Sequence, residues 1–221
     1  MKKIILYIFL VSSLYSAPEE TNGPAAALRW SVKTRNLKLV NQLIDWGADI
    51  DATDPEGLTA LMIASVVGCS DIFERLLLAN ANVNAATISG ITALMIAVDM
   101  ENIDLVDKLL CYGANIDSKN EKGSTALMYA VNKQSLILVD KLLSNGADVN
   151  MKAKHDLTPL MFAANKGNKD IIKKLLSAGA NIDDINDLGY TALMVAEKKG
   201  NKDVKKLLSK GSTFSRQCKK S

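Results

Sequence analysis

The chain has 221 residues and a net charge of +3; 48% of its residues are hydrophobic, whereas only 5% are aromatic. With one histidine and three cysteines, it offers little material for nucleophilic catalysis or for a metal site. The charge is uneven: residues 18–150 hold ten Lys and Arg against 17 Asp and Glu, whereas residues 151–221 hold 15 against seven. Such a divide either orients a partner or reflects a solvated, Lys-rich end layer.

The first 17 residues predict an export signal. Lys2 and Lys3 precede an apolar run over 4–11, and small residues follow as far as Ala17. This run is shorter than the roughly 20 apolar residues that a permanent anchor needs. We therefore expect a signal peptide over 1–17, a leader over 18–24, and a periplasmic or secreted product without a stable membrane anchor. An uncleaved inner-membrane anchor is the alternative.

A four-residue phrase then recurs with a fixed period. Thr-Ala-Leu-Met begins at 59, 92, 125 and 191, and Thr-Pro-Leu-Met begins at 158, so that successive copies lie 33 residues apart. A period of about 20–50 residues marks stacked repeats, each of which buries its apolar face only against its neighbours. We expect an all-α repeat solenoid over 25–212 with a basic tail over 213–221. The predicted repeats are 26–58, 59–91, 92–124, 125–157, 158–190 and 191–212.

Each repeat predicts two helices and two turns. The second helix carries apolar residues at i, i+1, i+4 and i+5, as at Leu138, Val139, Leu142 and Leu143, and these positions fall on one side of a helix. Glycines follow this stripe and also precede each Thr, with Asn80 and Asp156 as the exceptions. We expect the Thr to cap the first helix through its hydroxyl. The sixth repeat has a Lys-rich second helix, which suits a terminal cap.

The 33-residue period, the helix pairs, the Thr-Pro-Leu phrase and the Gly-Ala-Asp-Val-Asn of 146–150 together resemble the ankyrin repeat. The resemblance covers about residues 25–212. It departs at the histidine of the family's Thr-Pro-Leu-His motif, where this chain has Met62, Met95, Met128, Met161 and Met194. In that family the histidine ties the loop to the helix by hydrogen bonds, which a thioether cannot donate. We therefore expect packing to hold the loops here.

No cofactor or metal site is expected. His155, the single histidine, falls in a loop, and Asp183 and Asp184 lack the spacing of a calcium loop. Cys69 and Cys111 differ by about 15 Å in level along their helices, so they should not form a disulfide. Cys218 lies on the tail, so we expect a monomer in which this thiol is able to form an intermolecular disulfide.

The resemblance implies binding through the loop tips and the exposed, concave face of the first helices. Aligning those positions by the period gives an apolar group in the second and third repeats and a largely basic group further on. The apolar candidates either contact a partner or, as for Leu58 and Ile91, pack between hairpins. The candidates are Leu58, Val66, Val67, Ile88, Ile91 and Met100, followed by Lys133, Lys166, Tyr190, Lys198 and Lys199.

These features predict a non-enzymatic scaffold that binds a protein partner. The alternatives are a secreted effector that acts on host proteins and, less favoured, a small enzyme, which would need polar groups converging in a pocket. Nucleic acid is not expected as a partner, because the chain is predicted to be exported and because no aromatic residues interleave with the lysines in the sequence.

Overall fold

The computed structural model describes residues 23–209. The predicted signal peptide, the leader up to residue 22, the basic tail and Cys218 lie outside the described residues. Chain contacts divide the molecule into two compact units, one that ends at Ala85 and one that begins at Ala86. Both units are built from pairs of helices, so the predicted all-α repeat solenoid is confirmed as the fold class. Each unit is described by itself below.

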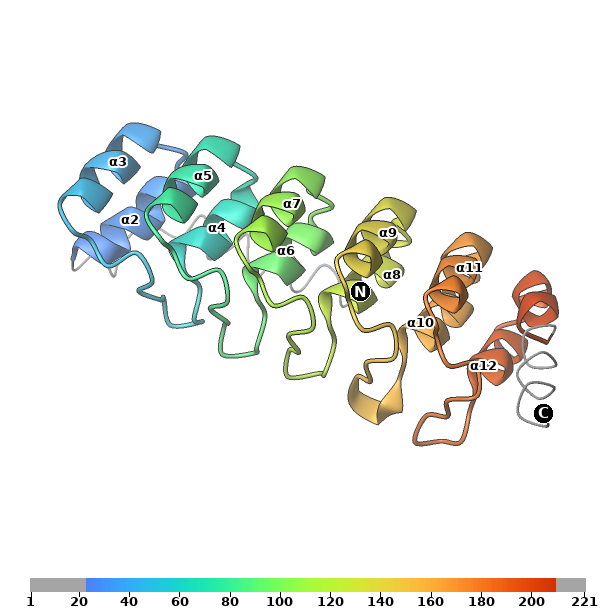
Figure 1. The fold of residues 1–221 in the computed structure, drawn as a ribbon. Coiled ribbons are helices and arrows are strands. Elements are labelled where there is room, and N and C mark those ends of the chain that lie inside the picture. The colour runs from blue at the N-terminus through green and yellow to red at the C-terminus, as the bar shows by residue number, and fades with distance from the viewer. Residues whose placement is uncertain (1–22, 210–221) are drawn as a thin grey trace. The chain divides into compact units, whose positions relative to one another are not determined.

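The first unit holds α2 (Pro24–Lys33), α3 (Leu37–Asp45), α4 (Ala60–Val67) and α5 (Ser70–Leu78). The second holds α6 (Ala93–Asp99), α7 (Ile103–Cys111), α8 (Ala126–Lys133), α9 (Leu136–Ser144), η1 (Lys154–Asp156), α10 (Pro159–Lys166), α11 (Lys169–Ser177) and α12 (Ala192–Lys198). Residues 202–209 are also helical. Figure 1 shows that, within the second unit, successive helix pairs stack side by side and the loops between pairs project on one side. α2 begins at Pro24 rather than after the expected leader, because proline suits the first position of a helix.

Within each unit, the first helices of the middle repeats are mostly buried. In α4 and α6 nearly every residue is buried. The Thr hydroxyl accepts the backbone N–H three residues on at Thr59, Thr92, Thr158 and Thr191, as predicted. Thr125 is the exception among these caps, since its Oγ1 is buried without a hydrogen-bond partner.

The apolar stripe of the second helix is buried as predicted at all four positions in α5 and at three of the four in α7, α9 and α11. In α9 these are Leu138, Val139 and Leu142, each fully buried. The fourth position differs: Leu143 is only half-buried, as are Leu110 and Leu176. The fourth side chain lies furthest round the helix, at the margin of the contact with neighbouring helices.

The second-helix glycines and their substitute behave as predicted. Gly47, Gly113, Gly146 and Gly179 adopt positive φ, and Asn80 does so with φ 62°. The structure adds a left-handed position that the sequence did not reveal, at the end of each first helix. Gly68, Gly167 and Gly200 occupy it, but Arg35, Glu101 and Gln134 stand there in the other repeats with φ of 55°, 56° and 61°.

The hairpin loops are held by backbone and side-chain hydrogen bonds. The side chain of Asn120 accepts the N–H groups of Lys122 and Ser124, and Asp54, Thr87 and Asn186 serve the equivalent role in other loops. The backbone of one loop also bonds to the next, as where Lys154 N donates to Lys122 O at 2.8 Å. Hydrogen bonds therefore hold the loops in addition to the packing expected from the sequence. Met62, Met95, Met128 and Met161 are buried, whereas Met194 in the last repeat is 45% exposed.

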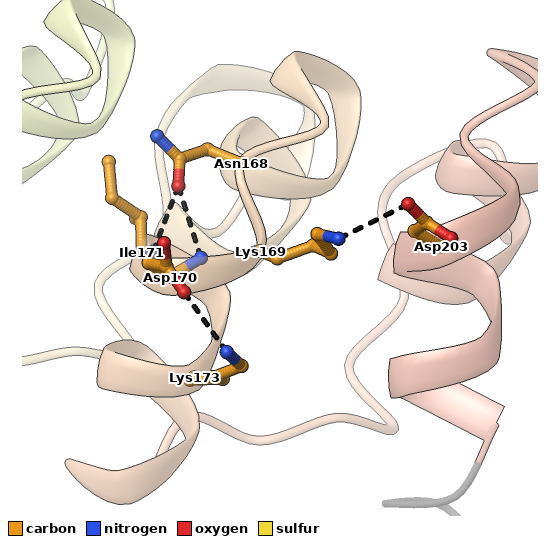
Figure 2. A network of polar contacts seen from close by, with 6 residues as sticks. All are labelled: Asn168, Lys169, Asp170, Ile171, Lys173 and Asp203. Atoms are coloured by element: carbon orange, nitrogen blue, oxygen red, sulfur yellow. Dashed lines mark hydrogen bonds and ion pairs between the residues drawn. The ribbon is translucent and has the colours of Figure 1, made fainter.

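The second helices are joined on their outer side by ion pairs between neighbouring repeats. Lys141 pairs with Asp107, and Lys174 pairs with Asp140. Figure 2 shows the last of these contacts, in which Lys169 Nζ lies 3.2 Å from Asp203 Oδ2 in the helix over 202–209 of the next repeat. In the same view Lys173 pairs with Asp170 of its own helix at 3.0 Å, and the side chain of Asn168 caps α11.

Candidate functional site

In the first unit, the structure corrects the position of Leu58. Its side chain is only 6% exposed, and its N–H donates to Asp54 Oδ1 at 2.7 Å, so Leu58 belongs to a closed hairpin and not to an accessible surface. Val66 and Val67 at the end of α4 are half-buried, and the Val67 carbonyl accepts a hydrogen bond from Arg35 at 2.8 Å. The remaining apolar candidates, Ile88, Ile91 and Met100, lie in the second unit.

The hairpin over 86–92 presents Ile88 to solvent. This side chain is 81% exposed, whereas Ile91 is half-buried. A bridge pairs Ala86 with Thr92, and Thr87 N donates to Ile91 O at 2.9 Å. The hairpin is also tied to the next loop, because Glu121 N donates to Ser89 O at 2.8 Å. An apolar side chain is thus exposed on a hairpin whose backbone is hydrogen-bonded both within itself and to the next loop.

The hairpin over 186–190 carries a second exposed apolar side chain. Leu188 is 72% exposed, and the side chain of Asn186 accepts the N–H groups of Leu188 and Tyr190. Leu188 is not among the candidates from the sequence, because the sequence does not show how far a loop residue is exposed. His155 in η1 is exposed as predicted and places Nδ1 2.6 Å from Asp187 Oδ2 in this hairpin.

We define the first-helix stripe as Tyr129 and Lys133 on α8, Phe162 and Lys166 on α10, and Val195 and Lys199 at α12. Within each helix the two members lie four residues apart and therefore on one side. The three apolar or aromatic members are half-buried, whereas Lys166 and Lys199 are exposed. Because α8 packs on α10 and α10 packs on α12, the stripe runs across neighbouring repeats.

Aromatic residues do accompany the lysines, which corrects the sequence-based interpretation. Tyr129 and Phe162 lie one turn before Lys133 and Lys166, a relation hidden in the sequence because intervening residues separate the members of each pair. Lys198 Nζ also lies 5.1 Å from the centroid of the Tyr190 ring, within the range of a cation–π contact. Tyr190, Lys198 and the stripe thus combine aromatic and cationic side chains in the last repeats.

Two members of this surface are tied to neighbouring groups. Lys133 Nζ lies 3.1 Å from Asp99 Oδ1 of α6, and Met100 is half-buried beside that aspartate in the chain. The Tyr129 hydroxyl accepts a hydrogen bond from Asn120 Nδ2 at 3.0 Å. Burial raises the pKa of Tyr129, since the charged phenolate is poorly solvated there, although the bond from Asn120 acts in the opposite direction.

Within residues 23–209, metal-binding groups, membrane spans and cysteines were the remaining candidate features of the sequence, and the described residues carry little of this chemistry. There, no group of three or more His, Cys, Asp and Glu residues could hold a metal ion. No helix in the same range is long and apolar enough to cross a membrane. Cys69 precedes α5, Cys111 ends α7, and both are free thiols.

Comparison with known proteins identifies the repeats. A family profile described as ankyrin repeats (3 copies) matches residues 26–120, 86–153 and 127–218. The search of curated proteins gave no significant match. The matched segments cover most of the chain and agree with the helix pairs, the capping threonines and the hairpins described above. Proteins built from these repeats are generally scaffolds for protein–protein interaction and typically lack enzymatic activity. The chain belongs to the ankyrin repeat family.

Proposed function

We propose that this protein is an exported, non-enzymatic scaffold that binds a protein partner through its hairpin tips and its first-helix stripe. The observation that carries the proposal is the exposure of Ile88, at 81%, on a hairpin fixed by backbone hydrogen bonds. When a partner covers a large apolar side chain and removes it from water, the free energy of the complex is lowered. The fixed backbone also lowers the entropy cost of binding.

Leu188 supports the same interpretation from the last described hairpin, since it is 72% exposed and its loop is closed around Asn186. The first-helix stripe adds half-buried aromatic side chains and exposed lysines, a composition that suits a polar protein surface with apolar anchors. Val66, Val67, Ile91 and Met100 are half-buried, so we assign them supporting contacts at most.

The binding proposal is tested by capture from the exported fraction. Ile88→Ser and Leu188→Ser, combined in one variant, should lose the proteins that the natural chain captures, because central apolar contacts dominate interface energies. The matched control is Ile137→Ser on α9, an exposed side chain of the same kind on the outer side of the stack. Identical captured proteins for the double variant and the natural chain would contradict the proposal.

Export is a separate part of the proposal and rests on Lys2, Lys3 and the apolar run that follows them. Protein recovered from the periplasm or the medium should begin between about residues 13 and 20, the usual uncertainty of a predicted cleavage site. N-terminal sequencing measures this directly. Intact Met1 on protein from the cytoplasm, with none outside it, would contradict export.

A further inference from the structure

The lysines of the second unit differ in whether a carboxylate neutralises them. On the outer side of the stack, lysines of the second helices are paired with aspartates of neighbouring repeats, as in Lys141 with Asp107 and Lys169 with Asp203. On the first helices, Lys133 is paired with Asp99 of the preceding repeat. Lys166 and Lys199 are exposed and have no carboxylate partner within the described part of the chain.

The repeat alignment explains why the last two lysines are unpaired. Lys133 follows Asp99 by 34 residues, and the same spacing joins Lys166 to Asn132 and Lys199 to Asn165. The helices that carry these residues pack in the same way, since α8, α10 and α12 succeed one another as α6 and α8 do. An amide therefore stands where Asp99 supplies a negative charge. Each Asn–Lys pair offers hydrogen-bond donors and a positive charge to an external anion.

We propose that the Asn132–Lys166 and Asn165–Lys199 pairs bind carboxylates of an acidic, partly apolar protein segment. This inference rests on the proposed scaffold function and specifies the chemistry of its partner. In each pair, a carboxylate of the segment takes the place that Asp99 occupies beside Lys133. Phe162 and Tyr129 are half-buried next to the lysines and provide apolar contact for the side chains between the acidic ones.

The spacing of the pairs sets the spacing of the acidic residues. Packed helices lie about 8–10 Å apart, so the two pairs, one repeat apart, are separated by a similar distance. A polyproline II segment rises about 3.1 Å per residue with three residues per turn, so its carboxylates at every third residue lie on one side, about 9 Å apart, and match this separation. Beside Lys133 the equivalent position is filled by a carboxylate, that of Asp99. The position therefore accommodates a side-chain carboxylate, and this favours a protein segment over the phosphates of a nucleic acid as the ligand.

The test uses the purified chain and a labelled synthetic peptide with glutamate at every third position and leucine and serine between. Fluorescence anisotropy measures its affinity beside a peptide with glutamine in place of each glutamate. The diagnostic variant combines Asn132→Asp and Asn165→Asp, which gives each lysine an internal carboxylate. The control combines Lys202→Gln and Lys206→Gln, two exposed lysines in helix 202–209, and changes the net charge by the same amount.

We expect the glutamate peptide to bind and the glutamine peptide to bind much more weakly. The Asn→Asp variant should bind the glutamate peptide about fivefold or more weakly, while the control stays within about twofold. Equal affinity for both peptides, or unchanged affinity in the Asn→Asp variant, would overturn the inference. The inference would also be overturned if a single-stranded oligonucleotide bound more tightly than the glutamate peptide and the Asn→Asp variant lost that binding. If capture still depends on Ile88 and Leu188 while peptide binding fails, the scaffold function stands and only the acidic partner is wrong.

Discussion

The stacking of helices between repeats is tested most directly at Leu142, whose side chain in α9 is fully buried. Leu142→Ala removes about three buried carbon groups, worth about 0.8 kcal/mol each, and leaves a cavity between neighbouring helices. We therefore expect the free energy of unfolding to fall by about 3 kcal/mol. Leu143 is the matched control, because it is the same residue type, adjacent in the same helix, and only half-buried. Leu143→Ala should cost about 1 kcal/mol.

Urea unfolding followed by far-UV circular dichroism measures both losses. Because a repeat array can unfold in parts, hydrogen exchange of α8, α9 and α11 should accompany the titration and locate the loss. The largest increase in exchange is expected in these three helices for Leu142→Ala. Equal losses for Leu142→Ala and Leu143→Ala would refute the proposed burial pattern of the second helices, and so would a loss below about 1 kcal/mol for Leu142→Ala.

Four further substitutions test local features. Gln134→Gly should raise the free energy of unfolding by about 0.5 kcal/mol, because glycine relieves the left-handed backbone at φ 61°. Gly167→Ala, at the equivalent position, should lower the free energy of unfolding by about 1–3 kcal/mol in the same urea assay. Unchanged stability in both variants would contradict the proposed strain at this left-handed position. Asp140→Asn should cost at most about 1 kcal/mol at low salt and almost nothing in about 1 M NaCl, since its pair with Lys174 is solvent-exposed; a cost unchanged by salt would be contrary to expectation. Burial raises the pKa of Tyr129 in the folded chain, so the stability that its protonated form contributes is fully present below the unfolded pKa and is lost as pH rises through the folded pKa. Tyr129→Phe lacks this titration, so the difference in unfolding free energy between the natural chain and the variant should narrow above about pH 10. A difference that stays constant with pH would refute this expectation.

The sequence by itself determined the repeat architecture, because the physics that specifies each repeat is local. Thr59 and its equivalents precede each first helix, and glycines such as Gly146 follow each second helix, so caps and turns recur with the period. The apolar spacing in segments such as 138–143 then identifies the buried side of each second helix. These signals need no knowledge of distant residues.

Only the tertiary structure decided which candidate residues are accessible. Leu58 and Ile88 are both apolar loop residues, yet one is 6% and the other 81% exposed. Leucine and isoleucine have similar hydropathy, so the difference in exposure depends on how each loop folds and on what covers the side chain. The left-handed position of Gln134 was equally hidden, because a residue type that tolerates several conformations carries no signal of the one it adopts.

Which charges form ion pairs also depends on the tertiary structure. The sequence shows Lys133, Lys166 and Lys199 as equivalent members of one period. The structure shows that Asp99 lies 3.1 Å from the first of them, while neutral amides precede the other two at the same spacing. An ion pair forms only when two side chains of different repeats come within a few ångströms of each other. The contact geometry was therefore needed to distinguish the neutralised lysine from the two lysines without a carboxylate at that position.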